Sequence, residues 1–195
     1  YGVLFGRLLD SAARADEWRR LAYVDDLTGL PNRRRLAAFL EEKLTLAAQS
    51  RTTVSLLIFD IDDFKKYNDR YGHDAGDALL REASLRIRRA IGEDDFLARL
   101  GGDEFAVILR DPESLAGAPE VADNILAAML EPFAIWQIAA HVGCSIGIAG
   151  PILRKIELSE LMRLADLAMY KSTQDGRGKV TVYTADLEAA ALLKA

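Results

Sequence analysis

The stretch FLARLGGDEFAVIL, residues 96–109, contains two apolar runs on either side of the glycine pair Gly101 and Gly102. The runs are rich in β-branched and aromatic residues, and glycine supplies the positive φ angles that a tight turn requires, so the stretch predicts a β-hairpin. Asp103 and Glu104 follow the glycines directly. The turn thus places a bare backbone beside two carboxylates, where an anionic group can approach if a divalent cation screens it from the acids. The alternative interpretation is a surface turn with solvated acids.

A second group of acids follows an apolar run upstream. Residues 53–60 are almost continuously hydrophobic, which predicts a central strand covered on both faces. Asp60, Asp62 and Asp63 lie where this strand ends. Burying carboxylates without a partner is costly, and a metal ion offsets that cost. The acidic end of the strand is therefore a candidate cation site.

The rest of the chain alternates helical and extended patterns. Apolar residues at three- and four-residue spacing predict helices over residues 1–23, 33–49, 64–71, 74–90, 115–131, 159–173 and 186–194. Further strands are expected over residues 133–138, 141–149 and 179–183. Asn32 and Ser159 are the expected N-caps of two helices, and Pro119 marks a helix start or a kink.

This order of elements predicts an α/β (α+β) fold of ferredoxin-like or palm type. The expected architecture is a mixed central sheet that includes the hairpin, with helices mainly on one face. Residues 24–184 would form one domain, preceded by an N-terminal helix (1–23) and followed by a short helical tail (185–195). Such a fold carries many functions and does not by itself name one.

Composition narrows the class of protein. The chain has 195 residues, a hydrophobic content of 50% and a formal net charge of −5, which argues against a general nucleic-acid binder. Cys144 is the only cysteine, so no intramolecular disulfide can form, and no Cys/His cluster has zinc spacing. No stretch approaches the roughly 20 apolar residues that span a bilayer. We expect a cytoplasmic protein.

The N-terminal segment 1–23 carries a narrow apolar stripe between charged residues. This pattern suits either a coiled-coil stalk or a helix that packs on the domain. Because the chain begins at Tyr1 without a methionine, we expect that an upstream sensor domain or membrane segment is missing.

Seven motifs occur in one order along the chain: DLTGLPNR at 26–33, FDIDDFK at 59–65, ND at 68–69, GHDAGD at 72–77, RLGGDEF at 99–105, SIG at 145–147 and ADLAMY at 165–170. Together they resemble the GGDEF-domain diguanylate cyclases of bacterial signalling over about residues 23–183. The resemblance implies that two facing domains, each holding one GTP, condense the nucleotides to cyclic di-GMP with loss of two pyrophosphates. It makes residues 24–184 the catalytic domain and a homodimer the active form.

The resemblance also implies a metal site. Asp60, the main-chain carbonyl of Ile61 and Asp103 match the family's magnesium ligands. Glu104 matches the neighbouring acid, which binds metal or activates the 3′-hydroxyl. The cofactor would be Mg²⁺, with Mn²⁺ as the alternative, because hard cations prefer oxygen ligands and help to neutralise charge on a reacting phosphate.

Substrate contacts follow from the same resemblance. Asn68 and Asp77 match the residues that read guanine, although alone each suits a structural role, Asn68 as a helix-end cap and Asp77 as a first-turn acid. The phosphates would contact the backbone or side chains of Phe64, Lys65, Gly101, Gly102, Arg177 and Arg99. The alternative role of Arg99 is that of an exposed strand residue.

Two positions depart from the family pattern. Thr173 stands where members often carry a phosphate-binding lysine. Lys171 lies two positions earlier on the helix and points away from this position, so Lys179 is the expected substitute. Residues 92–95 read GEDD where many members carry Arg-x-x-Asp, an inhibitory product site. Glycine cannot replace an arginine that grips phosphate and stacks on guanine. We therefore expect no product inhibition through this window.

Two other functions compete with the cyclase. One is a catalytically inactive domain that binds GTP and acts as a sensor or interaction module, for which Thr173 leaves room. The other is a palm-type nucleotidyl cyclase or polymerase-like enzyme with ATP or a primer end as reactant. Formation of cyclic di-GMP from GTP identifies the cyclase, GTP binding without turnover favours the inactive domain, and reaction of ATP or a primer end indicates the third.

Overall fold

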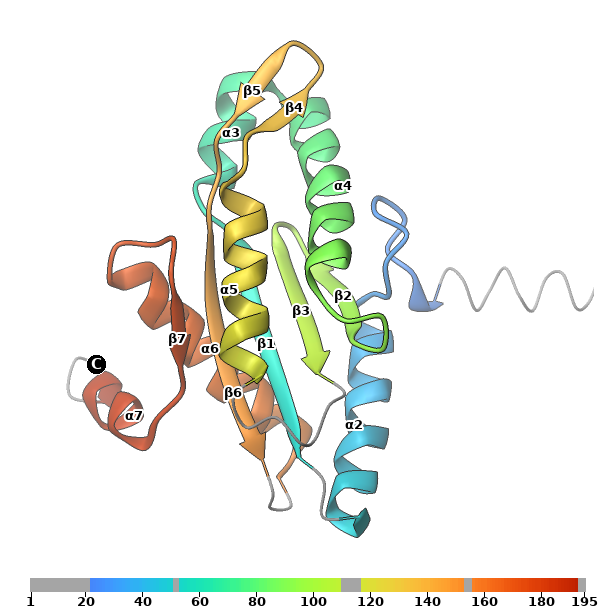
Figure 1. Ribbon diagram of the computed structural model, residues 1–195, viewed down its shortest axis with the longest axis vertical. Helices are drawn as coiled ribbons and strands as arrows, with labels where there is room; N and C mark the ends of the chain where they lie inside the picture. Colours follow the sequence, from blue (N-terminus) through green and yellow to red (C-terminus); the bar gives the residue numbers. More distant parts are fainter. Residues whose placement is uncertain (1–21, 51–52, 110–116, 153–155, 193–195) are drawn as a thin grey trace, which may run out of the picture.

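The computed structural model describes residues 22–50, 53–109, 117–152 and 156–192. In chain order, the elements in Figure 1 are α2 (Arg33–Ser50), β1 (Val54–Ile61), α3 (Phe64–Tyr71), α4 (His73–Ala90), β2 (Phe96–Gly101), β3 (Glu104–Leu109), α5 (Gly117–Leu130), β4 (Phe133–Ile135), β5 (Ile138–Ala140), β6 (Cys144–Ile152), α6 (Leu158–Gln174), β7 (Val180–Val182) and α7 (Ala185–Leu192). The expected N-terminal helix lies outside the described residues except at positions 22–23, which are helical. None of the helices in these ranges has the length and hydropathy to cross a bilayer.

The central sheet has five strands in the order β2-β3-β1-β6-β7. β1 pairs antiparallel with both β3 and β6, and β7 runs parallel to β6. β2 and β3 form the predicted hairpin. The prediction of a mixed central sheet with flanking helices is therefore confirmed, with the apolar strand β1 at its centre.

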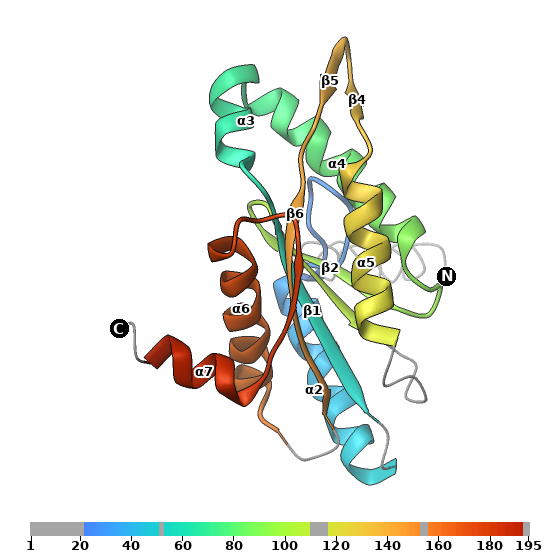
Figure 2. The same ribbon diagram turned by 60° about the vertical axis from the view of Figure 1, so that its left-hand side comes forward.

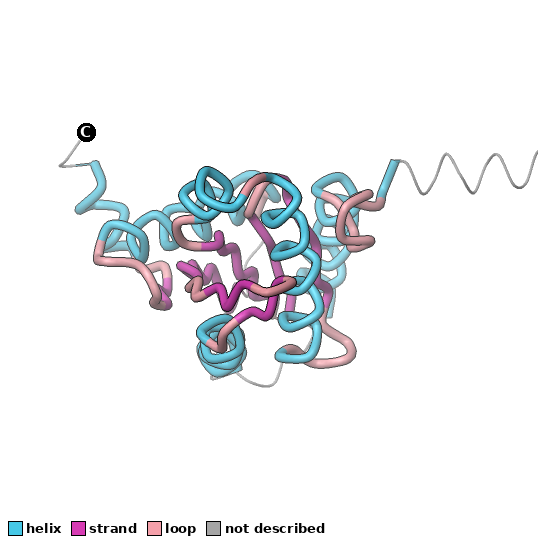
Figure 3. Tube along the Cα trace, turned by 90° about the horizontal axis from the view of Figure 1, so that it is seen from above, coloured by secondary structure: helices cyan, strands magenta, loops and turns pink. Residues whose placement is uncertain are grey.

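Helices cover both faces of this sheet. Alternate side chains of β1 enter two separate cores: Leu57 and Phe59 pack with residues of α4 and α5, whereas Leu56 and Ile58 pack with residues of α2 and α6. Figure 3, seen from above, shows helices on both sides of the strands. The expectation of helices mainly on one face is therefore wrong. A strand with apolar residues on both faces must be covered on both sides.

Residues 133–140 form a separate hairpin. The strand expected over residues 133–138 is interrupted at Trp136, whose φ of 53° reverses the chain between β4 and β5. This two-stranded sheet projects beyond the central one in Figure 2. The expected strand 141–149 begins only at Cys144, which is buried in the core as a small apolar residue. Neither glycine nor asparagine marks the turn at Trp136.

Three local signals had different outcomes. The Asn32 side chain accepts a hydrogen bond from the Arg35 N–H at 3.1 Å, so the predicted cap of α2 is confirmed. Pro119 lies in the first turn of α5 and marks its start rather than a kink. Ser159 is not a cap, because α6 begins at Leu158 and Glu157 holds the N-cap position.

Candidate active site

The two acidic turns meet at one end of the sheet. In the antiparallel pairing of β1 and β3, Asp60 lies directly opposite Glu104. The Ile61 N–H donates to the main-chain oxygen of Asp103 at 3.3 Å, which continues the pairing into the turn. Cross-strand partners project from the same face of a sheet, so the Asp60 and Glu104 side chains share the face covered by α2 and α6.

Asp60 is the least compensated carboxylate of this cluster. Its Oδ1 atom is buried and has no hydrogen-bond partner among the described residues. Burial, together with the negative charges of Asp62, Asp103 and Glu104, raises the pKa of Asp60 to about 6. Burial also raises the pKa values of Asp103 and Glu104. The site therefore concentrates negative charge at a place where burial makes that charge costly.

This donor set fits a hard divalent cation. A buried carboxylate oxygen that has no partner among the described residues and lies beside further acids is the arrangement that a cation relieves, and these acids supply oxygen donors. Within the described ranges, no three Asp, Glu, His or Cys side chains alone form a complete cation site. Partial protein coordination is what Mg²⁺ favours, because it usually keeps several waters and binds substrate phosphates.

Arg99 holds the hairpin turn through hydrogen bonds. Gly101 and Gly102 adopt φ angles of 133° and 56°, which only glycine reaches without strain. The Arg99 guanidinium donates to the Gly102 carbonyl, at 2.6 Å from one terminal nitrogen and at 3.0 Å from Nε, and to both oxygens of Asp25 at 2.9 and 3.0 Å. Arg99 is only 8% exposed, so the alternative role of an exposed strand residue is wrong. These contacts assign it to positioning the turn and do not support a phosphate contact.

Asp25 is a residue whose role sequence reasoning missed. Its Oδ1 accepts hydrogen bonds from the main chain and hydroxyl of Thr28, at 2.9 and 2.6 Å, as well as from Arg99. Burial alone would raise the pKa of Asp25, but these hydrogen bonds outweigh it and lower that pKa. The segment before α2 is thereby fastened to the acidic turn. The only signal was the position of Asp25 beside the first motif.

Glu104 also has neighbours that the sequence did not connect with it. Arg33 of α2 pairs with Glu104 at 3.4 Å, and its Nε donates to the Leu100 carbonyl at 3.4 Å. Burial dominates and raises the pKa of Glu104, while Arg33 opposes the rise and Asp166 of α6 adds to it. Two helices from the same face thus set the charge around this acid.

Asn68 and Asp77 lie on the neighbouring helices α3 and α4. The Asn68 side chain packs against Gly76, the residue before Asp77, and its Oδ1 is buried with no hydrogen-bond partner in the described part of the chain. The helix end at Gly72 is capped by the main-chain oxygen of Asn68, so the side chain is not the cap. Asp77 lies beyond the first turn of α4, where the acid is Asp74. Both alternative structural roles are therefore wrong.

The start of α3 is open to an anion. Asp63 precedes it in the left-handed conformation, with φ of 58°, and makes no side-chain capping bond. The first N–H groups of the helix, at Phe64 and Lys65, are of the kind that bind phosphate at helix N-termini. Arg177 reaches this place from the turn after α6, with a nitrogen 4.0 Å from Asp63 Oδ1. The structure thus brings three of the predicted phosphate-binding residues together.

Asp62 joins these segments, a role that sequence reasoning also missed. Its Oδ1 accepts from the Ser145 hydroxyl at 2.7 Å, and its Oδ2 accepts from the Gly178 N–H at 3.0 Å. The end of β1, the start of β6 and the turn that carries Arg177 are therefore tied by one carboxylate. The motif containing Ser145 was visible in the sequence, but its partner was not.

The region around Thr173 contains two engaged lysines. The Thr173 hydroxyl donates to the Met169 carbonyl at 3.2 Å. Lys171 pairs with Asp175 at 2.6 Å, and Lys179 donates to the Asp175 main-chain oxygen. Lys179 thus lies at the turn of Arg177, while Lys171 points to the C-terminal end of α6.

Residues 92–95 form a closed turn. The Gly92 N–H donates to Asp95 Oδ2 at 2.9 Å, and Arg88 donates to the main-chain oxygens of Gly92 and Asp95. The window therefore offers no arginine side chain of its own, and the nearest arginine on α4 is used to hold its backbone.

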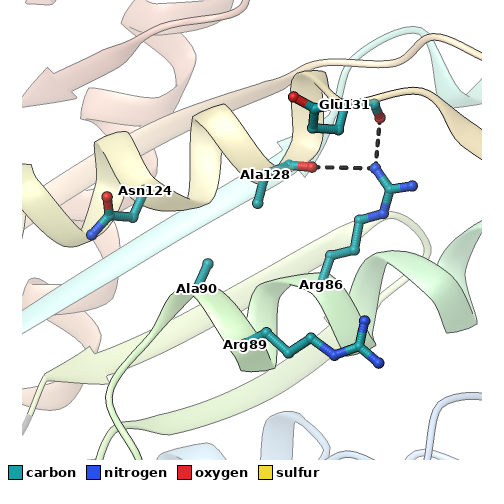
Figure 4. A pocket seen from close by; sticks show the side chains of 6 residues that line it. All are labelled: Arg86, Arg89, Ala90, Asn124, Ala128 and Glu131. Carbon is teal, nitrogen blue, oxygen red and sulfur yellow. Dashed lines mark hydrogen bonds between the residues drawn. The ribbon is translucent and has the colours of Figure 1, made fainter.

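A groove of about 580 Å³ between α4 and α5 contains none of the candidate residues. Figure 4 shows Arg86 reaching across it to the carbonyls of Ala128 and Glu131, at 3.3 and 2.6 Å. Arg86 also stacks on Phe133 at 3.8 Å. These contacts fasten the end of α5 to α4 and belong to the scaffold.

Comparisons with known proteins agree with this geometry. The family model described as diguanylate cyclase, GGDEF domain, matches residues 22–179. The cyclic di-GMP phosphodiesterase PdeR of Escherichia coli (strain K12) is 38% identical over 186 residues, which cover 95% of this chain and 28% of that protein. The diguanylate cyclase TpbB of Pseudomonas aeruginosa (strain UCBPP-PA14) is 40% identical over 186 residues, which cover 91% of this chain and 43% of that protein.

Solved structures give the same result. A fragment of TpbB from Pseudomonas aeruginosa (PAO1), comprising only the GGDEF domain, is similar with a TM-score of 0.82 and 37% identity, covering 89% of this chain and all of that one. The chain spans less than half the length of the two full-length relatives. The match over residues 22–179, with Glu104 of the GGDEF motif paired across β1 and β3 with Asp60, places this chain in the GGDEF domain family of diguanylate cyclases.

Proposed function

We propose that this chain is a diguanylate cyclase domain that condenses two molecules of GTP into cyclic di-GMP. The observation that carries the proposal is the pairing of Asp60 with Glu104, which gathers the acids of two separate motifs around a buried carboxylate oxygen that has no hydrogen-bond partner within the described ranges. A domain that served only as packing would gain nothing from this concentration of charge, because it raises the free energy of the folded state.

Asp60, the main-chain carbonyl of Ile61 and Asp103 would hold the divalent cation, with Glu104 beside them. We take the cation to be Mg²⁺, with Mn²⁺ as the alternative. When bound, it neutralises negative charge that develops on the reacting phosphate. The protein's own contribution is to hold the oxygen donors in place, through the β1–β3 pairing and through the hydrogen bonds of Arg99 to the turn.

GTP would lie across the end of the sheet. The N–H groups at the start of α3, Lys65 and Arg177 would bind its phosphates, and Gly101 and Gly102 leave room for them beside the turn. Asn68 and Asp77 would bind guanine, because a carboxylate accepts from the N1 and exocyclic amino hydrogens that adenine does not present together. Arg99 acts on this site through the turn.

In each condensation, the 3′-oxygen of one GTP forms a bond to the α-phosphorus of the other. The bond from that phosphorus to the bridging oxygen breaks, and pyrophosphate leaves with its electron pair. Glu104 would accept the proton of the 3′-hydroxyl. Two such steps close the ring and release two pyrophosphates. Since each domain holds one nucleotide, the reaction requires a homodimer of facing domains.

Residues 1–23 would link this domain to an upstream sensor. A change in the sensor would shift the population between productive and unproductive pairings of the two domains. The chain covers less than half the length of the two full-length relatives, which supports a longer complete protein.

Incubation with GTP and Mg²⁺, followed by chromatography of the products, tests the proposal. We expect cyclic di-GMP from the dimeric wild-type protein and none from Asp60→Ala or Glu104→Ala. Asp69→Ala is the matched control, because Asp69 is an exposed acid of α3 outside the cluster. Absence of product from the wild-type dimer would refute the cyclase.

A second candidate is a GTP-binding regulatory domain without turnover. Two observations favour it: Thr173 replaces a lysine that the family often carries, and one close relative is named a phosphodiesterase. This candidate predicts that the wild-type dimer binds GTP and leaves it unchanged in the same chromatographic assay.

A further inference from the structure

Gly76 stands in direct contact with the Asn68 side chain. A Cβ atom added to Gly76 would lie 1.8 Å from Oδ1 and 2.8 Å from Cγ of Asn68, and 3.2 Å from Cζ of Phe64. No real Cβ approaches another heavy atom as closely as 1.8 Å. The room that a side chain would fill at position 76 is occupied by the Asn68 carboxamide.

Neither backbone geometry nor helix formation explains the glycine. Gly76 is not among the described glycines with a positive φ angle, so an alanine would fit the local backbone. Its N–H donates to the Gly72 carbonyl at 3.2 Å within α4, where glycine is one of the least favourable residues. What requires a glycine here is the neighbouring side chain of α3.

We infer that Gly76 is a positioning residue for base selection, and this inference rests on the proposed function. Because position 76 has no side chain, the carboxamide of Asn68 lies directly against α4 there, one residue before Asp77. The carboxamide and the carboxylate are then held side by side as one surface toward guanine. The packed contact fixes the carboxamide although its Oδ1 has no hydrogen-bond partner in the described residues.

An alanine at position 76 would displace Asn68 but leave Asp77 in place. The contact of 1.8 Å would have to open to at least the 3.4 Å of ordinary van der Waals packing. A hydrogen bond is lost over a shift of this size. We expect the effect to fall mainly on the base, because the added methyl would lie 1.8 Å from the Asn68 carboxamide but 3.2 Å from the ring of Phe64, whose main-chain N–H is the part proposed to bind phosphate.

A double-mutant cycle tests the inference. The proteins are the wild type, Gly76→Ala, Asn68→Ala and the double variant. The probes are 3′-deoxy-GTP and 3′-deoxy-ATP, which bind but cannot be condensed, with Mg²⁺ present. Calorimetry gives the dissociation constants, and thermal unfolding reports the fold of each protein.

We expect Gly76→Ala to weaken the binding of 3′-deoxy-GTP about tenfold, which is the factor expected for one lost hydrogen bond. The affinity for 3′-deoxy-ATP should change little. Once Asn68 is alanine, the added methyl meets no carboxamide, so the double variant should bind as Asn68→Ala does. In turnover, KM for GTP should rise more than kcat falls. A merely structural glycine would weaken both nucleotides equally and in both backgrounds, and that result overturns the inference.

Three further outcomes are decisive. If Gly76→Ala does not fold, the double variant must fold and bind as Asn68→Ala; if it too is unfolded, the glycine serves another purpose and the inference is wrong. If the wild type does not prefer 3′-deoxy-GTP, the proposed function and the inference fall together. Equal affinity of the wild type and Gly76→Ala for 3′-deoxy-GTP refutes the inference alone.

Discussion

Asp60 of β1 and Glu104 of β3 are cross-strand partners, and the Asp60 oxygen Oδ1 is buried without a hydrogen-bond partner in the described residues. This pairing makes the metal-free domain carry an electrostatic penalty. Because one strand pairing sets both the fold of the sheet and the charge of the site, stability and function are opposed at this position.

Removing the charge of Asp60 should stabilise the metal-free protein. The folded-state pKa of about 6 lies above the ordinary 3.8, so the folded protein binds the proton more tightly than the unfolded chain does. Stability should therefore fall as the pH rises from about 4 to 6, and the penalty remains in full above that window. With allowance for solvent screening, Asp60→Asn should add about 1–2 kcal/mol to the free energy of unfolding at pH 7.5 and nothing near pH 4.

Urea unfolding in the presence of a chelator, at pH 4 and at pH 7.5, measures this difference in the free energy of unfolding. Asp69→Asn is the control, because this exposed acid lies outside the cluster and its substitution should change the free energy of unfolding little at either pH. A less stable Asp60→Asn protein at pH 7.5 would contradict the electrostatic account.

Loss of Arg99 should destabilise the domain. Its side chain is 9% exposed and that of Asp25 is 20% exposed, so alanine would leave a largely buried carboxylate with its Thr28 donors alone and would remove the guanidinium donor of the Gly102 carbonyl. Breaking a buried pair in this way costs about 3 kcal/mol. Arg99→Lys should recover only part, because an ammonium cannot reach both partners as a guanidinium does.

Thermal or urea unfolding checks this prediction, with Arg34→Ala as the control at an exposed position of α2. An Arg99→Ala protein as stable as Arg34→Ala would show that the contacts of Arg99 with Gly102 and Asp25 do not stabilise the domain.

Gly147 should tolerate no side chain. A Cβ there would lie 2.1 Å from the Met169 nitrogen and 2.2 Å from the Ala165 oxygen, both backbone atoms of α6. Gly147→Ala must push α6 away from β6, which costs about 3 kcal/mol or more, and should also reduce turnover because α6 leads to the Arg177 turn. Gly92→Ala is the comparison: its Cβ meets only the end of the Asp95 side chain at 3.0 Å. Equal unfolding midpoints for the two variants would contradict the packing argument.

Cyclic di-GMP should not inhibit turnover through residues 92–95. This turn contains no arginine, and Arg88 is engaged with its main-chain oxygens. Asp95→Ala should therefore leave the response of the initial rate to added product unchanged. Strong inhibition of the wild type that disappears in Asp95→Ala would show that the turn binds product.

The sequence predicted the parts of the fold that local patterns control. The glycine pair predicted the hairpin, the continuous apolar run predicted β1, and Asn32 predicted the start of α2. The turn at Trp136 escaped prediction because a bulky residue takes the left-handed conformation there, without the usual glycine or asparagine. The placement of helices on both faces was implied by β1, which is buried on both sides.

The site was predictable as a set of residues but not as a set of contacts. The acids followed from the two motifs and their family resemblance. The partners of Arg99 and Asp62 did not, because Asp25 lies 74 residues from Arg99 and Gly178 lies 116 residues from Asp62. Such pairs exist only once the sheet has brought the segments together.

The central claim is that the acids of the two turns share a cation that docks a guanine nucleotide. The most direct measurement is the affinity of the wild type, Asp60→Ala and Asp69→Ala for 3′-deoxy-GTP, with Mg²⁺ and with a chelator. Mg²⁺ should tighten binding at least about tenfold in the wild type and in Asp69→Ala, but not in Asp60→Ala. An Asp60→Ala protein that responds to Mg²⁺ as strongly as the wild type would contradict the claim.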